Sequence, residues 1–221
     1  MKVNVKKRGI FISIEGGEGT GKTTQTKPLT KYLIERGYKV KLTQEPGGTR
    51  IGKLIRKTLL NPDNAEIDRW TELFLYLADR AQHVKQIIIP ALNQGKAVIC
   101  DRFIDATVAY QGFGRGISLK LIDNLNRLVT QGIKPDLTIC LDLGPCKGLS
   151  RAKSKYAKKG NSRKGDRLEK EDISFHRRVR KGYLALAKKE PDRVKVVKVV
   201  SPVSRTYSLI KKYVDAILRE I

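Results

Sequence analysis

The sequence predicts an α/β fold in which one parallel sheet is covered by helices on both faces. Five short apolar runs alternate with longer segments of helical periodicity along the 221 residues. Parallel strands are usually joined by helices, so this alternation indicates a parallel sheet. Folds of this class bind ligands at the carboxyl ends of their strands. Two polar stretches stand at such ends, one after the first apolar run and one after the third.

The five expected strands are rich in Val, Ile or Leu, which favour extended structure in buried positions. In chain order they read IFISIE, KVKLTQ, AVIC, LTICLDL and VKVVKVV, at residues 10–15, 39–44, 97–100, 137–143 and 194–200. Helices are expected where apolar side chains recur at helical spacing, at residues 22–36, 51–59, 71–93, 119–131, 170–189 and 203–219. Every connection between successive strands therefore contains a helix.

One segment departs from this pattern. Residues 150–165 read SRAKSKYAKKGNSRKG and are interpreted as a basic, flexible insert of low hydrophobicity. The sequence shows no internal repeat, and 221 residues are enough to bury one sizeable core. A single domain is therefore expected over residues 1–221.

Composition is that of a soluble globular protein, with 40% hydrophobic and 31% charged residues. The longest apolar stretches, such as residues 87–92, are far shorter than the ~20 residues that a membrane-spanning helix needs. The basic start MKVNVKKRG leads directly into the first strand without a small-residue cleavage site, so a signal peptide is not expected. We expect a cytoplasmic protein without a membrane partner.

The net charge of +24 predicts a positive field that attracts anions. Nucleic-acid binding is one interpretation. The other is a lysine-rich solvated surface that also attracts small phosphorylated molecules, and this interpretation is favoured because much of the charge is spread over amphipathic helices. The three cysteines, Cys100, Cys140 and Cys146, lack the spacing of a metal site or a disulfide framework and are interpreted as core residues.

The first polar stretch reads EGGEGTGKTT, and residues 16–23 match the pattern GxxxxGK[ST] between a strand and a helix. Glycines let the backbone N–H groups of this phosphate loop point at phosphate oxygens, helped by the start of the next helix. Lys22 is expected to reach the β- and γ-phosphates, and Thr23 to bind Mg²⁺. The predicted ATP-binding residues of the loop are Gly16, Gly17, Glu18, Gly19, Thr20, Gly21, Lys22, Thr23 and Thr24.

The second polar stretch follows the third strand, where the sequence reads VICDRF. Asp101 ends the apolar run as a carboxylate linked to Mg²⁺ would. Motor ATPases usually have a water-activating glutamate next, whereas this chain has Arg102, whose guanidinium suits a second anionic substrate. The stretch therefore indicates phosphoryl transfer between two anions.

Six motifs resemble those of thymidylate kinases and occur in that family's order. They are EPGGT at residues 45–49, LADRAQH at 77–83, DRFIDATVAYQG at 101–112, GRG at 114–116, KPDLTICLDL at 134–143 and DRLE at 166–169. The resemblance implies a P-loop fold of the nucleoside monophosphate kinases, with a five-stranded parallel sheet. It also implies transfer of the γ-phosphoryl group of ATP to dTMP, a need for Mg²⁺ and a homodimer.

The resemblance also implies roles for single residues. Lys22, Arg102 and an arginine of the lid would share the charge of the transferred group, and Glu18 would face the sugar of the acceptor. Residues 150–166 would be the lid, with Arg163 as its catalytic arginine, Arg167 beside it and Arg151 against the adenine. The implied acceptor site consists of Arg56 at the phosphate, Tyr76 stacked on the base, Arg80 at the thymine edge, Thr107 and Gln111 lining the base pocket, and Tyr110 near the sugar.

Four positions differ from the common family pattern, namely Gln44, Tyr76, Phe103 and Ala106. None of them removes a catalytic charge, yet Tyr76 and Ala106 border the expected base pocket. A kinase for another pyrimidine monophosphate, dUMP or UMP, therefore remains an alternative. A nucleic-acid-stimulated ATPase is a third hypothesis, against which Arg102 and the acceptor-site motifs both argue.

Overall fold

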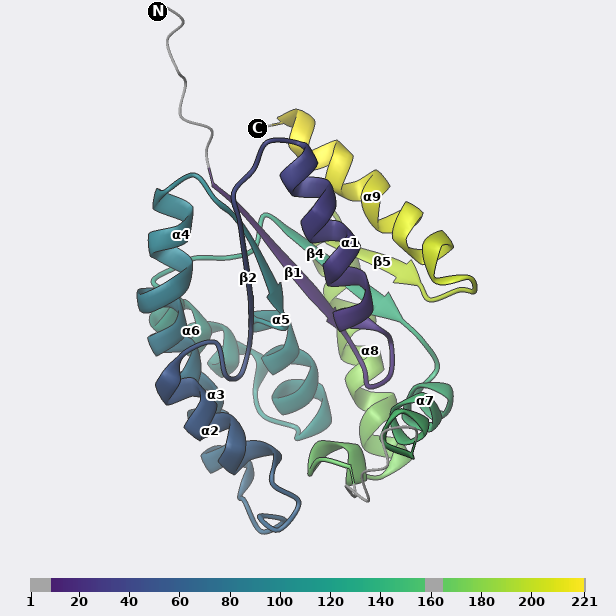
Figure 1. Ribbon diagram of the computed structural model, residues 1–221. Helices are drawn as coiled ribbons and strands as arrows, with labels where there is room; N and C mark the ends of the chain where they lie inside the picture. The colour runs from purple at the N-terminus through teal and green to yellow at the C-terminus, as the bar shows by residue number, and fades with distance from the viewer. Residues whose placement is uncertain (1–8, 158–164, 221) are drawn as a thin grey trace, which may run out of the picture.

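A computed structural model describes residues 9–157 and 165–220 of the chain and contains one sheet of five parallel strands (Figure 1). The strands are β1 (Ile10–Gly16), β2 (Val40–Gln44), β3 (Ala97–Asp101), β4 (Leu137–Asp142) and β5 (Val194–Lys198). Their order in the sheet is β2-β3-β1-β4-β5. The predicted α/β class with a parallel sheet is confirmed, and each strand lies within one or two residues of its expected limits.

The strand register brings the polar ends of the first and third strands together. Ile14 of β1 and Gln44 of β2 both pair with Asp101 of β3. Gly16, the last residue of β1, pairs with Leu141 of β4. The phosphate loop and Asp101 therefore leave the same edge of the sheet.

The helices confirm most of the predicted helical segments. Those expected from periodicity are α1 (Lys22–Glu35), α2 (Arg50–Leu60), α3 (Arg69–His83), α6 (Leu119–Thr130), α8 (Ile173–Lys189) and α9 (Val203–Glu220). The single long helix expected at residues 71–93 is wrong in detail, since a π-helical turn, η1 (Val84–Ile88), separates α3 from α4 (Ile89–Asn93). The interruption precedes Pro90, which has no backbone N–H to continue the α-helical ladder.

Helical structure also occurs where none was expected. Residues after β3 form α5 (Ile104–Thr107) and a π-helical segment, η2 (Val108–Gly114), and a short 3₁₀ turn, η3 (Leu168–Lys170), precedes α8. Helix α7 (Pro145–Ala157) covers the first half of the supposed flexible insert, so that interpretation is wrong for residues 150–157. Its basic residues and alanines have good helix propensity, which the low hydrophobicity had obscured.

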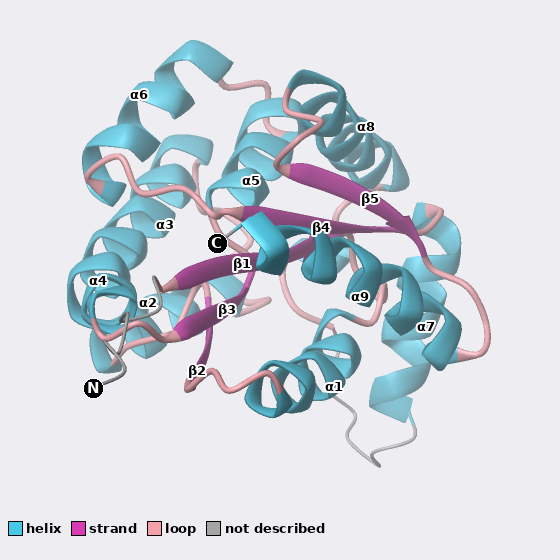
Figure 2. Cartoon of the chain, turned by 90° about the horizontal axis from the view of Figure 1, so that it is seen from above, coloured by secondary structure: helices cyan, strands magenta, loops and turns pink. Residues whose placement is uncertain are grey.

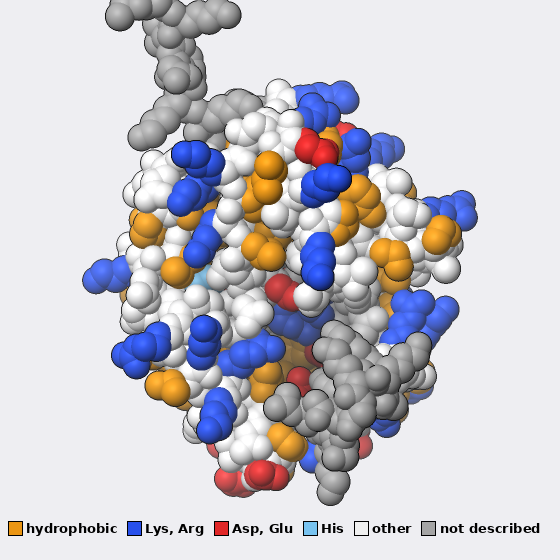
Figure 3. All heavy atoms as spheres, viewed as in Figure 1, with side chains coloured by type: hydrophobic (Ala, Val, Ile, Leu, Met, Phe, Trp, Pro, Cys, Tyr) orange, Lys and Arg blue, Asp and Glu red, His pale blue; other side chains and the backbone are white. Residues whose placement is uncertain are grey.

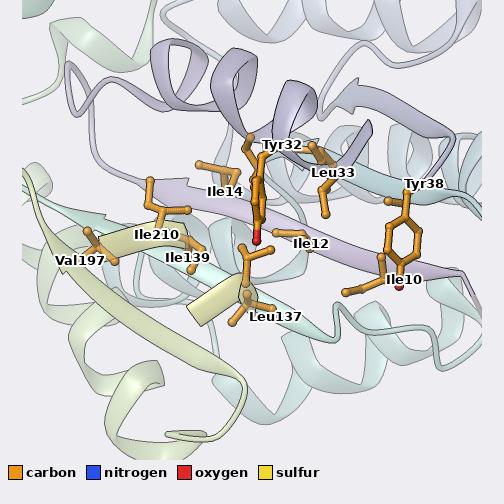
Figure 4. Packing of buried hydrophobic residues seen from close by; sticks show 14 of the residues in the cluster. Ile10, Ile12, Ile14, Tyr32, Leu33, Tyr38, Leu137, Ile139, Val197 and Ile210 are labelled. Atoms are coloured by element: carbon orange, nitrogen blue, oxygen red, sulfur yellow. The ribbon is translucent and has the colours of Figure 1, made fainter. Parts of the chain in front are cut away.

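Helices cover both faces of the sheet (Figure 2). On one face, α1 and α9 pack against side chains of alternate strand residues, among them Ile10, Ile12 and Ile14 of β1 (Figure 4). On the other face, α4 and η1 pack against β3, and α8 and η2 against β4. Cys100 and Cys140 are buried in this second layer as expected, whereas Cys146 on α7 is exposed, so its interpretation as a core residue is wrong.

Candidate functional site

A cavity of about 410 Å³ opens at the carboxyl edge of the sheet, where β1, β2 and β3 end. Its walls are the phosphate loop, the turn after β2, the end of β3, and parts of α2, α3 and α7. The residues that line it include Glu18, Gly19, Gly21, Lys22, Thr23, Thr24, Gln44, Arg56, Tyr76, Asp101, Arg102 and Arg151. The fold thus brings most of the predicted ATP-binding and metal-binding residues into one hollow.

The phosphate loop is curled around the Lys22 side chain. Lys22 Nζ donates to the carbonyl oxygens of Gly16, at 3.1 Å, and Gly17, at 3.0 Å. Gly19 and Gly21 have φ values of 64° and 89°, which favour glycine. Burial and the nearby Arg102 lower the pKa of Lys22, against the attraction of Glu18. The ammonium group is therefore held ready for an anion whose charge would compensate both cations.

Thr23 and Asp101 lie together at the mouth of the loop. The Thr23 hydroxyl donates to Asp101 Oδ2 at 3.3 Å, although 78 residues separate the two in sequence. Both offer oxygen ligands, the kind that a hard divalent cation prefers. Among the described residues no group of three or more His, Cys, Asp or Glu side chains could hold a metal ion. Two protein oxygens fit Mg²⁺, which keeps several waters and takes further ligands from phosphates.

Arg102 leaves β3 in a left-handed conformation, with φ of 70°. Its Nη2 donates to Glu18 Oε1 at 2.7 Å, its Nη1 donates to the Tyr183 hydroxyl at 3.2 Å, and its guanidinium lies 4.8 Å from the centre of the Tyr110 ring. Tyr110 also donates to Glu18 Oε1, at 2.6 Å. Burial opposes ionisation of Glu18, but Arg102 and Lys22 outweigh it and lower the pKa of Glu18 to about 2.

Glu15 lies beneath Arg102 and was not predicted as a site residue. It is fully buried, and its carboxylate accepts from the backbone N–H of Phe103 at 2.6 Å and from the Tyr183 hydroxyl at 2.9 Å. Burial, together with the charge of Asp105, raises the pKa of Glu15 to about 7. Glu15 thus fixes the backbone after Arg102 and the tyrosine that contacts its guanidinium.

A second, smaller cavity continues from the first and shares four lining residues with it, Glu45, Tyr76, Arg102 and Leu168. It is lined by the predicted base-pocket residues Tyr76, Arg80, Thr107, Tyr110 and Gln111, together with Glu45, Phe103 and Ala106. The structure therefore brings together the residues of the implied acceptor site. Arg56 lines the larger cavity, and its Nη1 donates to the Pro46 carbonyl oxygen at 2.8 Å.

Arg80 is almost fully buried, and four of its N–H groups are used inside the protein. Nε donates to Glu45 at 2.8 Å, the two N–H groups of Nη1 donate to Thr107 at 2.8 Å and Asn126 at 2.6 Å, and Nη2 donates to the Phe103 carbonyl at 3.0 Å. A guanidinium has five N–H groups, so one on Nη2 has no acceptor among the described residues. The side chain is fixed and still offers one donor.

Glu45 was quoted in a motif but not predicted to carry a role. Its second oxygen, Oε1, lies 2.8 Å from His83 Nδ1, so one carboxylate links Arg80 and His83. Another buried carboxylate, Glu72, contacts Gln111, Arg115 and Arg167. No local pattern marks Glu15, Glu45 or Glu72 as site residues, because their partners are distant in sequence.

The expected lid arginines have different positions. Arg163 lies outside the described residues. Arg151 is exposed on α7 and lines the larger cavity, consistent with a place at its rim. Arg167 is only 5% exposed and donates to the Leu59 carbonyl and to Glu72, so in this conformation it anchors the segment before α8 rather than facing the cavity.

Comparisons with known proteins agree with this geometry. The family model for thymidylate kinase matches residues 14–210. A thymidylate kinase of Desulfosudis oleivorans is 50% identical over 193 residues, covering 87% of this chain and 90% of its own. One of Maridesulfovibrio salexigens is 53% identical over 188 residues, covering 85% and 87%. The crystal structure of thymidylate kinase from Ehrlichia chaffeensis superposes with a TM-score of 0.75 at 36% identity, covering 94% of this chain and 99% of that chain.

Proposed function

The chain belongs to the thymidylate kinase family, and on this premise we propose how its site phosphorylates dTMP to dTDP with ATP as donor. The observation that carries the proposal is the junction of the two cavities at Arg102. One cavity contains the phosphate loop and the other contains the base-pocket residues. Arg102 therefore lies where the transferred phosphoryl group must pass from donor to acceptor.

Phosphoryl transfer needs positioning and cancellation of charge more than covalent help. The acceptor is already a phosphate, so no general base is required. Lys22 binds the β- and γ-phosphates of ATP, and Arg102 binds the acceptor phosphate and the transferred group. Arg56, at the rim of the same cavity, is the second cation for the acceptor phosphate. The phosphate-loop N–H groups complete the donor site.

Mg²⁺ is proposed to be held by Thr23 and Asp101, whose side-chain oxygens are 3.3 Å apart. Bound at these residues, the ion would supply positive charge that offsets the negative charge developing during transfer. The interaction between Thr23 and Asp101 keeps both oxygens on the side of the loop that faces the donor.

The acceptor base is proposed to lie in the smaller cavity, stacked on Tyr76. The free N–H of Arg80 then donates to a base carbonyl, and Thr107 holds Arg80 in place through its hydroxyl oxygen. Glu18 and Tyr110, which hydrogen-bond each other, face the sugar. The Tyr110 ring is proposed to lie against the sugar, where it would disfavour a 2′-hydroxyl.

The lid is proposed to supply further charge to the donor side. Arg163 is the proposed catalytic arginine of the lid. Arg151 is proposed to pack against the adenine of ATP, because it already lines the donor cavity.

A homodimer is proposed on an apolar surface formed by α2, α3 and α6, which pack side by side. This surface includes Leu54, Phe74 and Leu128, which are 58%, 56% and 73% exposed. Monomers rarely leave several large apolar side chains exposed in one region. Figures 1 and 2 show the three helices on the same side of the molecule.

A cytoplasmic location is proposed from the substrates, since ATP and nucleoside monophosphates are cytoplasmic metabolites. The described part of the chain has no helix with the length and apolar character that a membrane crossing requires.

The test is ADP release from Mg-ATP by the purified protein, with dTMP, dUMP, UMP, dCMP and AMP offered separately and DNA alone as a further sample. We expect strong preference for dTMP. Preference for dUMP or UMP would keep the phosphoryl-transfer roles and change the proposed base pocket. Stimulation by DNA without any monophosphate would contradict the proposed acceptor site.

A further inference from the structure

The carboxylate of Glu72 lies behind the base pocket, in the first turn of α3, and is 1% exposed. It accepts four hydrogen bonds. Oε1 accepts from Gln111 Nε2 at 2.8 Å and Arg115 Nε at 3.1 Å, and Oε2 accepts from Arg115 Nη2 at 2.9 Å and Arg167 Nη2 at 2.5 Å. A carboxylate offers about four acceptor positions, so this group is saturated. Glu72 is not among the residues that line the pocket, so it acts there only through Gln111.

The charge state of Glu72 decides how Gln111 is oriented. Burial favours the neutral acid, but hydrogen bonds from Arg115 and Gln111 and the charge of Arg167 lower the pKa of Glu72. An ionised carboxylate can only accept hydrogen bonds. The NH₂ end of the Gln111 amide must therefore face Glu72, and the reverse orientation would bring two oxygens together.

The other end of that amide is available to a ligand. Gln111 lines the base pocket, and its Oε1 accepts no hydrogen bond from the described residues. Oε1 is also not enclosed by protein. Three side-chain atoms of the described chain are enclosed and have no partner, Gln25 Oε1, Asp79 Oδ2 and His176 Nε2, and Gln111 Oε1 is not one of them. The pocket is thus lined by two residues with unused hydrogen-bonding groups, an acceptor of Gln111 and one N–H of Arg80.

We propose that Glu72 is a positioning residue for base selection, which holds the Gln111 amide with Oε1 toward the base and so selects pyrimidines with an N–H at position 3. The inference rests on the proposed function, because it needs the base to lie in this pocket. It adds a residue outside the pocket that decides which pyrimidine edge fits.

The base edges explain the selection. Thymine and uracil present an N3–H donor and an O4 acceptor, which match Gln111 Oε1 and the Arg80 N–H. Cytosine presents an acceptor at N3 and an amino donor at position 4. Two acceptors would therefore meet at Gln111 Oε1, and two donors would meet at the Arg80 N–H. A site whose buried polar groups are left unpaired rejects an analogue strongly. If the Gln111 amide were reversed, its NH₂ would instead suit the N3 acceptor of cytosine.

The experiment measures the dissociation constants of dTMP and dCMP by calorimetry without ATP, and kcat/KM for both with Mg-ATP. Glu72→Gln can accept or donate toward Gln111, so it permits both amide orientations. We expect the preference for dTMP over dCMP to fall about tenfold or more in both measurements. Glu72→Asp keeps the charge for Arg115 and Arg167 but withdraws the oxygen from Gln111 by one methylene. It should also lower the preference, and it decides the question if Glu72→Gln does not fold.

Arg115→Lys is the matched control. Arg115 also contacts Glu171 and lies over the Phe175 ring, so this change weakens the same buried cluster without touching Gln111. We expect a lower melting temperature and an unchanged preference for dTMP over dCMP.

Failure of the inference and failure of the proposed function give different results. If the Glu72 variants lose thermal stability but keep the wild-type preference, Glu72 has only a structural role and the inference is overturned. If the wild-type protein itself binds dCMP as well as dTMP, the proposed base pocket fails, and the inference fails with it.

Discussion

At the scale of single residues, the site depends on two cations that the fold holds close to one another. Lys22 is kept in place by backbone oxygens of the phosphate loop, and Arg102 by Glu18 and Tyr183. Burial and the charge of Arg102 lower the pKa of Lys22, so a polyanion bound near both groups would relieve their repulsion.

Lys22→Ala and Arg102→Ala are each expected to lower kcat by about 100-fold or more, since both groups act on charge that develops during transfer. The circular dichroism spectrum and the melting temperature should change little. Lys27→Ala is a suitable control, because Lys27 is an exposed lysine of the same helix. Steady-state kinetics with dTMP check the prediction, and near-normal turnover in either site variant would contradict the assigned roles.

Glu15 gives a prediction for pH. Its pKa is raised from an ordinary 4.5 to about 7, so between these values the folded protein binds more protons than the unfolded chain. Stability contributed by this group therefore falls as the pH rises from 4.5 to 7, by roughly 3 kcal/mol in all. Glu15→Gln cannot titrate. The melting temperature of the wild type relative to Glu15→Gln should thus decrease between pH 5 and pH 8.

This comparison cancels the contributions of other acids that titrate in both proteins, such as Glu18 and Asp79. A constant difference in melting temperature across the pH range would show that Glu15 is ionised throughout.

At the scale of elements, the phosphate loop and α7 meet backbone to backbone. A Cβ on Gly148 of α7 would lie 2.3 Å from the Glu18 carbonyl oxygen, and a Cβ on Gly19 would lie 1.9 Å from the Gly148 carbonyl oxygen. Glycine at both positions permits this close approach. Helix α7 therefore rests directly on the phosphate loop.

Gly148→Ala is expected to force the phosphate loop and α7 apart and to raise the KM for ATP severalfold. Helix propensity alone would make this change favourable, because alanine stabilises a helix by about 1 kcal/mol relative to glycine. Gly144→Ala is the control, because a Cβ there meets nothing within 4 Å. ATP titrations of both variants check the prediction. An unchanged KM in Gly148→Ala would show that α7 and the phosphate loop can move apart without weakening ATP binding.

At the scale of the whole molecule, charge and apolar surface have different distributions. Figure 3 shows Lys and Arg side chains spread over one face rather than gathered in a single patch. This spread is consistent with a solvated basic surface, which was favoured over nucleic-acid binding. The apolar surface of α2, α3 and α6 is instead concentrated on neighbouring helices and is the proposed dimer interface.

Phe74→Glu is expected to convert the dimer into a monomer, because it places a charge in the middle of the apolar surface. Ile34→Glu is the matched control, since Ile34 is 56% exposed like Phe74 but lies on α1, on the opposite face of the sheet. Sedimentation analysis of both variants and the wild type checks the prediction. A monomeric wild-type protein, or a dimer that survives Phe74→Glu, would contradict the assignment of this surface.

Much of the fold could be predicted because its signals are local. The strands were recognisable from runs of four to seven residues rich in Val, Ile or Leu, and the phosphate loop from eight consecutive residues. Helices α5 and α7 and segment η2 were missed. Residues 104–114 contain glycines and β-branched residues that weaken the helical pattern, and tertiary packing against α8 stabilises them instead.

Local patterns in the sequence were sufficient for the α/β class, the phosphate loop, the carboxylate of Asp101 after β3 and, by resemblance, the kinase family. The buried acids that support the site became apparent only from the folded chain. Glu72 contacts Gln111 and Arg167 across 39 and 95 residues, and Glu15 contacts Phe103 across 88. The physical reason is that a buried carboxylate depends on the donors that surround it in space, and no spacing along the chain records those donors.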